Sequence, residues 1–121
     1  MQFKTYQYIA SKFADYEKFK IKNILEYLTI GMVGEAGEVA NKIKKILRHD
    51  TEKINEQIKL DIAKELGDVL WYMSELSSYL GFNLNEIAEI NIDKLNERKL
   101  LNTIRGVGDG SRRNNVNETN S

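Results

Sequence analysis

The fold is decided by residues 23–47, which read NILEYLTIGMVGEAGEVANKIKKIL. Hydrophobic residues recur there at steps of three or four, the spacing of one face of an α-helix: Leu25, Leu28, Met32, Ala36, Val39, Ile43 and Ile46. The stretch therefore predicts one long amphipathic helix. Arg48 and His49 follow at its carboxyl end, where positive charge suits the helix dipole.

The same spacing predicts a second long helix over residues 58–80, IKLDIAKELGDVLWYMSELSSYL. Gly81 is placed to cap its carboxyl end. Shorter helices are expected at about residues 6–13 and from Asn83 onward, where Glu86 three residues later gives a start that resembles a capping box. The chain is therefore expected to be all-α.

A polar link at residues 50–56 joins the two long helices, so they are expected to pair as an antiparallel hairpin. One hairpin with two shorter helices has only a thin core, and we expect a second subunit to complete a four-helix bundle. The folded domain is expected to span residues 1–104. Residues 105–121 are rich in Gly, Asn and Arg and predict a flexible tail. Its part up to Arg113 is expected to close over bound phosphate, with an inert tail as the alternative.

Composition excludes several classes of protein. The 121 residues include no Cys, a single His, and 18 basic and 18 acidic side chains. Disulfides and thiolate chemistry are therefore excluded, and the balanced charge argues against a general nucleic-acid binder. No hydrophobic run approaches the ~20 residues that span a bilayer, and the start lacks the pattern of a signal peptide. We expect a cytoplasmic protein without a membrane or nucleic-acid partner.

Two pairs of acidic residues interrupt the hydrophobic stripes, Glu35 with Glu38 and Glu65 with Asp68. At about 100° per residue, Glu35 and Glu65 fall inside the hydrophobic sectors of their helices, and the second acid of each pair falls at the edge. Carboxylates directed into one bundle repel each other, and each is costly to bury unless it is paired or coordinated. Mg²⁺, which prefers oxygen ligands, would relieve both problems. A solvated acidic face is the alternative.

Three glycines stand beside these acids inside the helical patterns: Gly34, Gly37 and Gly67. Each is unfavourable by about 1 kcal/mol relative to Ala in a helix interior. Close approach of a neighbouring helix or of a ligand would compensate for this cost, and ordinary helix packing is an equal alternative.

The fourth helix carries the opposite charge within its own hydrophobic sector, at Asn91, Lys94 and Arg98. An amide, an ammonium group and a guanidinium group suit a polyphosphate, although the two cations also have the length to reach outward to solvent. Lys42 is a further candidate for phosphate binding. The alternative for Lys42 is an i,i+4 pair with Glu38 on the helix surface.

Three motifs together resemble one family. GEAGEV at 34–39 followed by ELGDVLW at 65–71 is similar to the E-x-x-E … E-x-x-D signature of MazG-like pyrophosphohydrolases, in the all-α NTP pyrophosphohydrolase superfamily. NIDKL at 91–95 with Arg98 resembles the family's N-x-x-K-L-x-x-R ending. Many members have an aromatic residue after that arginine, whereas Lys99 stands here. Weaker likeness near both ends extends the resemblance over nearly the whole chain up to residue 113.

The resemblance implies Mg²⁺-dependent hydrolysis of a nucleoside or deoxynucleoside triphosphate to the monophosphate and pyrophosphate, by a homodimer or homotetramer. It implies a metal, Mg²⁺ with Mn²⁺ as the alternative, on Glu35, Glu38, Glu65 and Asp68. Coordination would activate the attacking water. Glu38 is the expected proton acceptor, and Glu35 is the second expected catalytic residue. A nucleotide-binding module that does not cleave and a helical dimerisation module are the rival interpretations.

Overall fold

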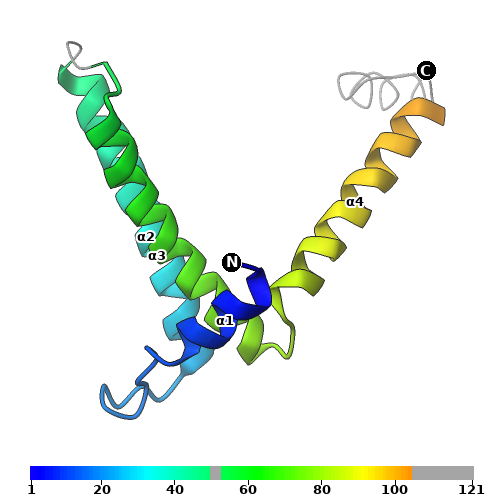
Figure 1. Ribbon diagram of the computed structural model, residues 1–121, viewed down its shortest axis with the longest axis horizontal. Coiled ribbons are helices and arrows are strands. Elements are labelled where there is room, and N and C mark those ends of the chain that lie inside the picture. Colours follow the sequence, from blue (N-terminus) through cyan, green and yellow to red (C-terminus); the bar gives the residue numbers. More distant parts are fainter. Residues whose placement is uncertain (50–52, 105–121) are drawn as a thin grey trace, which may run out of the picture. The chain divides into compact units, whose positions relative to one another are not determined.

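The computed structural model describes residues 1–49 and 53–104, which form four α-helices and no strand (Figure 1). α1 spans Phe3–Ser11, α2 Ile24–His49, α3 Glu56–Tyr79 and α4 Leu84–Ile104. The all-α prediction is confirmed for this part of the chain, and the predicted helix bounds lie within a few residues of the observed ones. The expected flexible tail at residues 105–121 lies outside the described residues, and so does its part up to residue 113 that is expected to close over bound phosphate.

The two long helices begin at asparagine caps. The side-chain oxygen of Asn23 accepts a hydrogen bond from the backbone N–H of Glu26 at 3.0 Å, and that of Asn55 accepts one from Ile58 at 2.8 Å. Each cap satisfies a backbone donor that has no partner within the first turn of a helix.

α3 ends in the turn that its glycine predicts. Gly81 has φ +83°, a conformation that glycine adopts without strain. Its N–H donates to the carbonyl of Ser78 at 3.0 Å, and the N–H of Phe82 donates to the carbonyl of Ser77 at 2.9 Å. This pair of bonds is a Schellman motif, so the predicted C-terminal cap is confirmed.

α2 and α3 lie side by side as the predicted hairpin, and α1 packs against α3 (Figure 1). The described chain divides into two compact units, Met1–Asn85 and the segment from Glu86 onward. The first unit contains α1, the hairpin and the first residues of α4. In the second unit, the side chains at residues 89–101 of α4 are all exposed.

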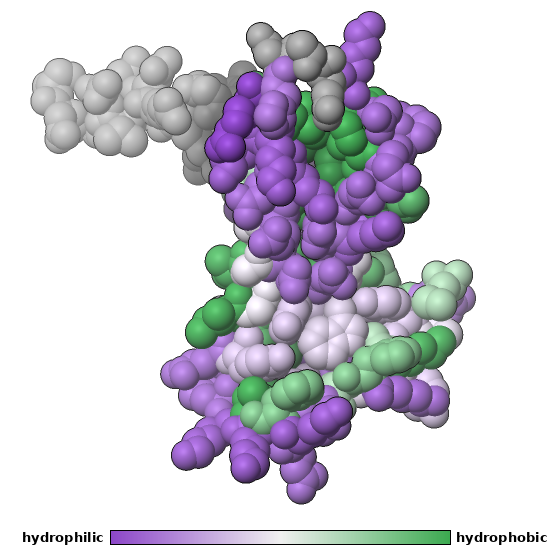
Figure 2. Space-filling view, turned by 90° about the vertical axis from the view of Figure 1, so that its left-hand side faces the viewer, coloured by the Kyte–Doolittle hydropathy of each residue, from purple (hydrophilic) through white to green (hydrophobic). Residues whose placement is uncertain are grey.

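The hydrophobic core of the described chain is thin, as the sequence predicts. Its buried hydrophobic side chains are Ala10, Leu28 and Leu84. Large hydrophobic side chains stay exposed on the hairpin, for example Ile30 and Val33 on α2, and Figure 2 shows hydrophobic groups at the surface between hydrophilic ones. None of the helices at residues 1–49 and 53–104 is long and apolar enough to cross a membrane.

Candidate metal centre

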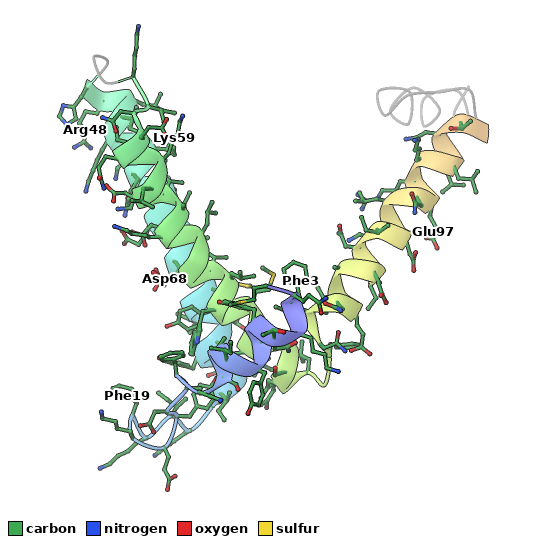
Figure 3. The ribbon with its side chains drawn as sticks, viewed as in Figure 1. Phe3, Phe19, Arg48, Lys59, Asp68 and Glu97 are labelled. Atoms are coloured by element: carbon green, nitrogen blue, oxygen red, sulfur yellow. The ribbon has the colours of Figure 1, made fainter. Side chains whose placement is uncertain are left out.

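The hairpin brings three of the predicted acids together. Glu35 on α2 meets Glu65 and Asp68 on α3, and one carboxylate oxygen from each lies within 4.8 Å of the other two. Figure 3 labels Asp68 on the hairpin between α1 and the far end, where Arg48 and Lys59 lie. The i,i+3 spacing on α3 puts both of its acids on the face that meets α2. We call these three residues the acid cluster.

The fourth predicted ligand stands apart from the acid cluster. Glu38 is exposed on α2 and is not one of the three residues whose oxygens converge. Its negative charge is nevertheless among the causes that raise the pKa of Glu35, so the carboxylate lies close enough to interact with the cluster.

Mutual repulsion in the acid cluster is visible in the pKa of Glu35, which is raised above its usual range. Partial burial is the largest cause, followed by the negative charges of Asp68, Glu65 and Glu38. Each of these causes disfavours the ionised carboxylate. A cation between the carboxylates would reverse the effect of the neighbouring charges.

Lys42 supplies one positive charge to this region. Its Nζ lies 3.1 Å from Oε1 of Glu65, across the hairpin. That hydrogen bond is the largest cause of the raised pKa of Lys42, and burial acts in the opposite direction. The ammonium group is thus held by the acid on the other helix, and the negative charge of Glu38, its expected i,i+4 partner, is a smaller cause of the raised pKa of Lys42.

The acid cluster has the chemistry of a hard-cation site. Its three donors are all carboxylate oxygens, the ligand type that Mg²⁺ prefers. Ligands at about 2.1 Å from one Mg²⁺ ion lie at most about 4 Å apart. Oxygens within 4.8 Å of one another reach that separation by small side-chain rotations, so the residues present fit the metal.

The predicted phosphate-binding residues lie in both units. Lys42 is half-buried on α2, whereas Asn91, Lys94 and Arg98 are exposed on α4 beyond Asn85. The spacing of the α4 residues puts all three on one side of that helix. Because they belong to the second unit, a role for them toward the acid cluster stays a prediction.

Within the described chain, no neighbouring helix packs closely on the three glycines beside the acids. A Cβ atom added at Gly34, Gly37 or Gly67 would meet nothing within 4 Å in the described chain. No helix of the described chain therefore makes the expected close approach, and approach by a ligand stays a prediction. The close contact lies instead at Gly31, where a Cβ atom would collide with the ring of Tyr72.

Hydrogen bonds from two polar side chains join α1 to the hairpin, and helical periodicity does not reveal either of them. Buried Gln7 donates to Oγ of Ser78 at 2.7 Å, and its Oε1 accepts from the backbone N–H of Leu84 at 2.9 Å. Trp71, which helical periodicity places on the polar side of its helix, donates from its indole N–H to the carbonyl of Ala10 at 3.1 Å. Both contacts join segments far apart in the chain, which explains why sequence spacing does not reveal them.

A buried acid and a row of tyrosines are a further feature that sequence spacing misses. Glu75 on α3 accepts a hydrogen bond from the hydroxyl of Tyr16 at 2.7 Å. The ring of Tyr16 contacts Tyr27, and Tyr27 contacts Tyr72. The row therefore connects the segment between α1 and α2 to the part of the hairpin that carries the acid cluster.

The comparisons with known proteins concern the same region of the chain. The model of a family described as the MazG nucleotide pyrophosphohydrolase domain matches residues 20–100. The Gene 37 protein of Mycobacterium phage L5 is 46% identical over 85 residues, which amount to 70% of this chain and 75% of that protein. No solved structure matches. The family match includes both acidic pairs and the basic residues of α4.

Proposed function

We propose that the chain hydrolyses a nucleoside or deoxynucleoside triphosphate to the monophosphate and pyrophosphate. The chain belongs to the family of the MazG nucleotide pyrophosphohydrolase domain, and that membership supports the proposal. The cofactor is Mg²⁺, with Mn²⁺ as the alternative. The observation that carries this proposal is the convergence of Glu35, Glu65 and Asp68 from two helices, with oxygens within 4.8 Å of one another.

The acid cluster would hold the cation, which when bound lowers the pKa of water and screens charge on phosphate oxygens. Glu38 stands beside the cluster with its carboxylate exposed, so it is available to accept the proton of the attacking water. Glu35, which faces the two acids of α3, is the second catalytic residue in this proposal.

Four polar or basic side chains would bind the triphosphate: Lys42, Asn91, Lys94 and Arg98. Lys42 is the one in the first unit, and its ammonium group now neutralises Glu65. When a cation takes over that role, Lys42 becomes free to donate to a phosphate oxygen. Lys94 and Arg98 would neutralise the charge that develops on the leaving pyrophosphate.

A second copy of the chain would complete the domain. The hairpin exposes large hydrophobic side chains, among them Ile30 and Val33 on α2 and Leu66 on α3. Hydrophobic surface left uncovered on a helical hairpin is buried in other all-α proteins by further helices. We therefore propose a homodimer or homotetramer whose subunits form the four-helix bundle together.

Hydrolysis of a panel of ribo- and deoxyribonucleoside triphosphates tests the proposed reaction. The products are separated by chromatography, with Mg²⁺, with Mn²⁺ and with a chelator. We expect equal amounts of monophosphate and pyrophosphate from at least one nucleotide, and none with the chelator. Binding without cleavage across the whole panel would instead support a nucleotide-binding module. Release of diphosphate and inorganic phosphate would show a different reaction.

A further inference from the structure

Glu75 is an acid that the proposed reaction does not use. It lies on α3 and is 6% exposed. Its Oε2 accepts the hydroxyl of Tyr16 at 2.7 Å, and its Oε1 is buried without a hydrogen-bond partner in the described chain. A buried carboxyl group with one unpaired oxygen is unfavourable for folding, and a hydrophobic side chain of similar size would avoid that penalty. Packing alone therefore gives no reason for an acid at this position.

Tyr16 connects Glu75 to Tyr27 and Tyr72 through aromatic contacts. Its ring meets that of Tyr27 edge to face, with centroids 6.3 Å apart. Tyr27 in turn meets Tyr72 edge to face, with centroids 6.2 Å apart. Edge-to-face aromatic pairs have preferred geometries, so each ring limits the orientation of the next.

Tyr72 ends this row between the two helices that carry the acid cluster. Its ring fills the space that the missing side chain of Gly31 leaves on α2, and it stands one turn after Asp68 on α3. Burial and the hydrogen bond with Tyr27, followed by the charges of Glu35 and Asp68, raise its pKa to about 12. The phenol is therefore neutral at physiological pH and lies within the electrostatic field of the cluster.

Tyr6 on α1 is further evidence that the two groups of acids share one neighbourhood. Burial is the largest cause of its raised pKa, and the charges of Asp68 and Glu75 follow. Tyr6 thus interacts with Asp68 of the acid cluster and with the buried Glu75.

We propose that Glu75 is a positioning residue for the metal site: through Tyr16 and Tyr27 it holds the Tyr72 ring against Gly31. The position of that ring sets the separation of α2 and α3 where Glu35 faces the acids of α3. The inference rests on the proposed function, because it assigns Glu75 a role toward the cation that the acid cluster would hold. Misplacement of a ligand by about 1 Å is enough to weaken such a site.

Three variants separate the hydrogen bond from general destabilisation. Glu75→Leu removes the acceptor, Tyr16→Phe removes the donor, and Glu75→Gln keeps an oxygen that accepts from the tyrosine. Asn55→Ala is the matched control, since it removes the N-cap of α3 at the opposite end of the helix. Tyr16→Phe deletes one hydroxyl group, so it decides the question if Glu75→Leu does not fold.

The readout is the fluorescence of Trp71, the single tryptophan of the chain, during titration with Mg²⁺ in the absence of nucleotide. Its ring lies 5.0 Å from that of Tyr72, so its emission reports on the position of the tyrosine. We expect Glu75→Leu and Tyr16→Phe to raise the Mg²⁺ midpoint about 10-fold or more, the scale of losing a supporting contact of a metal ligand. Glu75→Gln and Asn55→Ala should keep the wild-type midpoint.

Two patterns of result overturn the inference while the proposed function stands. In one, wild-type protein responds to Mg²⁺ and the Glu75→Leu and Tyr16→Phe variants match Asn55→Ala. In the other, Glu75→Gln behaves like Glu75→Leu, which would show that the charge and not the hydrogen bond matters. Wild-type protein that neither responds to Mg²⁺ nor cleaves any nucleotide would overturn the proposed function, and the inference with it.

Discussion

Two stretches of the hairpin differ in how the chain covers them. Near α1, Leu28 and Glu75 are buried, and contacts from Gln7 and Trp71 join α1 to α3 and the start of α4. In the stretch that carries the acid cluster, positions such as Gly34 face open space instead. The first stretch is stabilised by contacts within the chain. In the second, the described chain gives Gly34, Gly37 and Gly67 no such contact, and it brings three acids together with Lys42 as the cation paired with one of them.

That difference separates the part of the hairpin that folds the unit from the part available for function. Glycine in a helix interior is unfavourable by about 1 kcal/mol, and no contact in the described chain offsets this at Gly34, Gly37 or Gly67. Repulsion within the acid cluster adds a further unfavourable contribution. Unfavourable features of this kind are expected where a protein binds ligands.

Loss of an acid from the cluster should have the largest effect. We expect Glu35→Gln and Glu65→Gln each to lower the affinity for the metal by more than the ~10–100-fold that loss of a supporting residue causes. Both variants should therefore lose turnover. The fold should persist, as checked by circular dichroism. Glu56→Gln makes the same change on an exposed acid of α3 and should leave turnover unchanged. Mg²⁺-dependent activity in both cluster variants would refute the site assignment.

We next expect the protein to form an oligomer. The hydrophobic side chains exposed on the hairpin, such as Ile30 and Val33, should be covered by another subunit. Sedimentation at micromolar concentration should therefore show a dimer or a larger species. An active monomer would mean that the exposed stretch of the hairpin needs no partner.

Glycine-to-alanine variants compare the covered and the open stretch directly. Gly31→Ala should destabilise the protein by about 1–3 kcal/mol, because its Cβ atom displaces the ring of Tyr72. Gly34→Ala and Gly67→Ala should stabilise it by up to about 1 kcal/mol. Denaturant unfolding measures both effects, and equal destabilisation at all three positions would remove the proposed contrast. Stabilised variants with reduced turnover would place a ligand or partner against those glycines.

The smallest predicted effect is on the thermal stability of the metal-free protein, where the acids of the cluster repel one another. The pKa of Glu35 is raised in the folded state, so the stability linked to its proton is present below the usual carboxyl range and is lost as pH rises through the raised pKa. Glu35→Gln should therefore melt slightly higher than wild type at neutral pH with a chelator. At pH values below the usual carboxyl range, where the raised pKa leaves the wild-type carboxyl protonated, the advantage should vanish. An advantage that persists at low pH would point to a cause other than charge.

The sequence predicts what depends on local spacing. The helices and the cap at Gly81 follow from periodicity and turn chemistry. Periodicity also places the acids beside the hydrophobic stripes, and the structure brings Glu35, Glu65 and Asp68 together while Glu38 stays exposed. The contacts of Glu75 and Gly31 do not follow, because they depend on side chains from other segments that meet only after folding.

Calorimetric titration of Mg²⁺ into metal-free protein tests the central claim most directly, which is that the acid cluster of the hairpin is a metal site. We expect saturable binding to wild-type protein. Asp68→Asn should weaken this binding by at least about 10-fold, and Glu56→Gln should leave it unchanged. Absence of binding to wild-type protein, or equal binding by Asp68→Asn, would contradict the account.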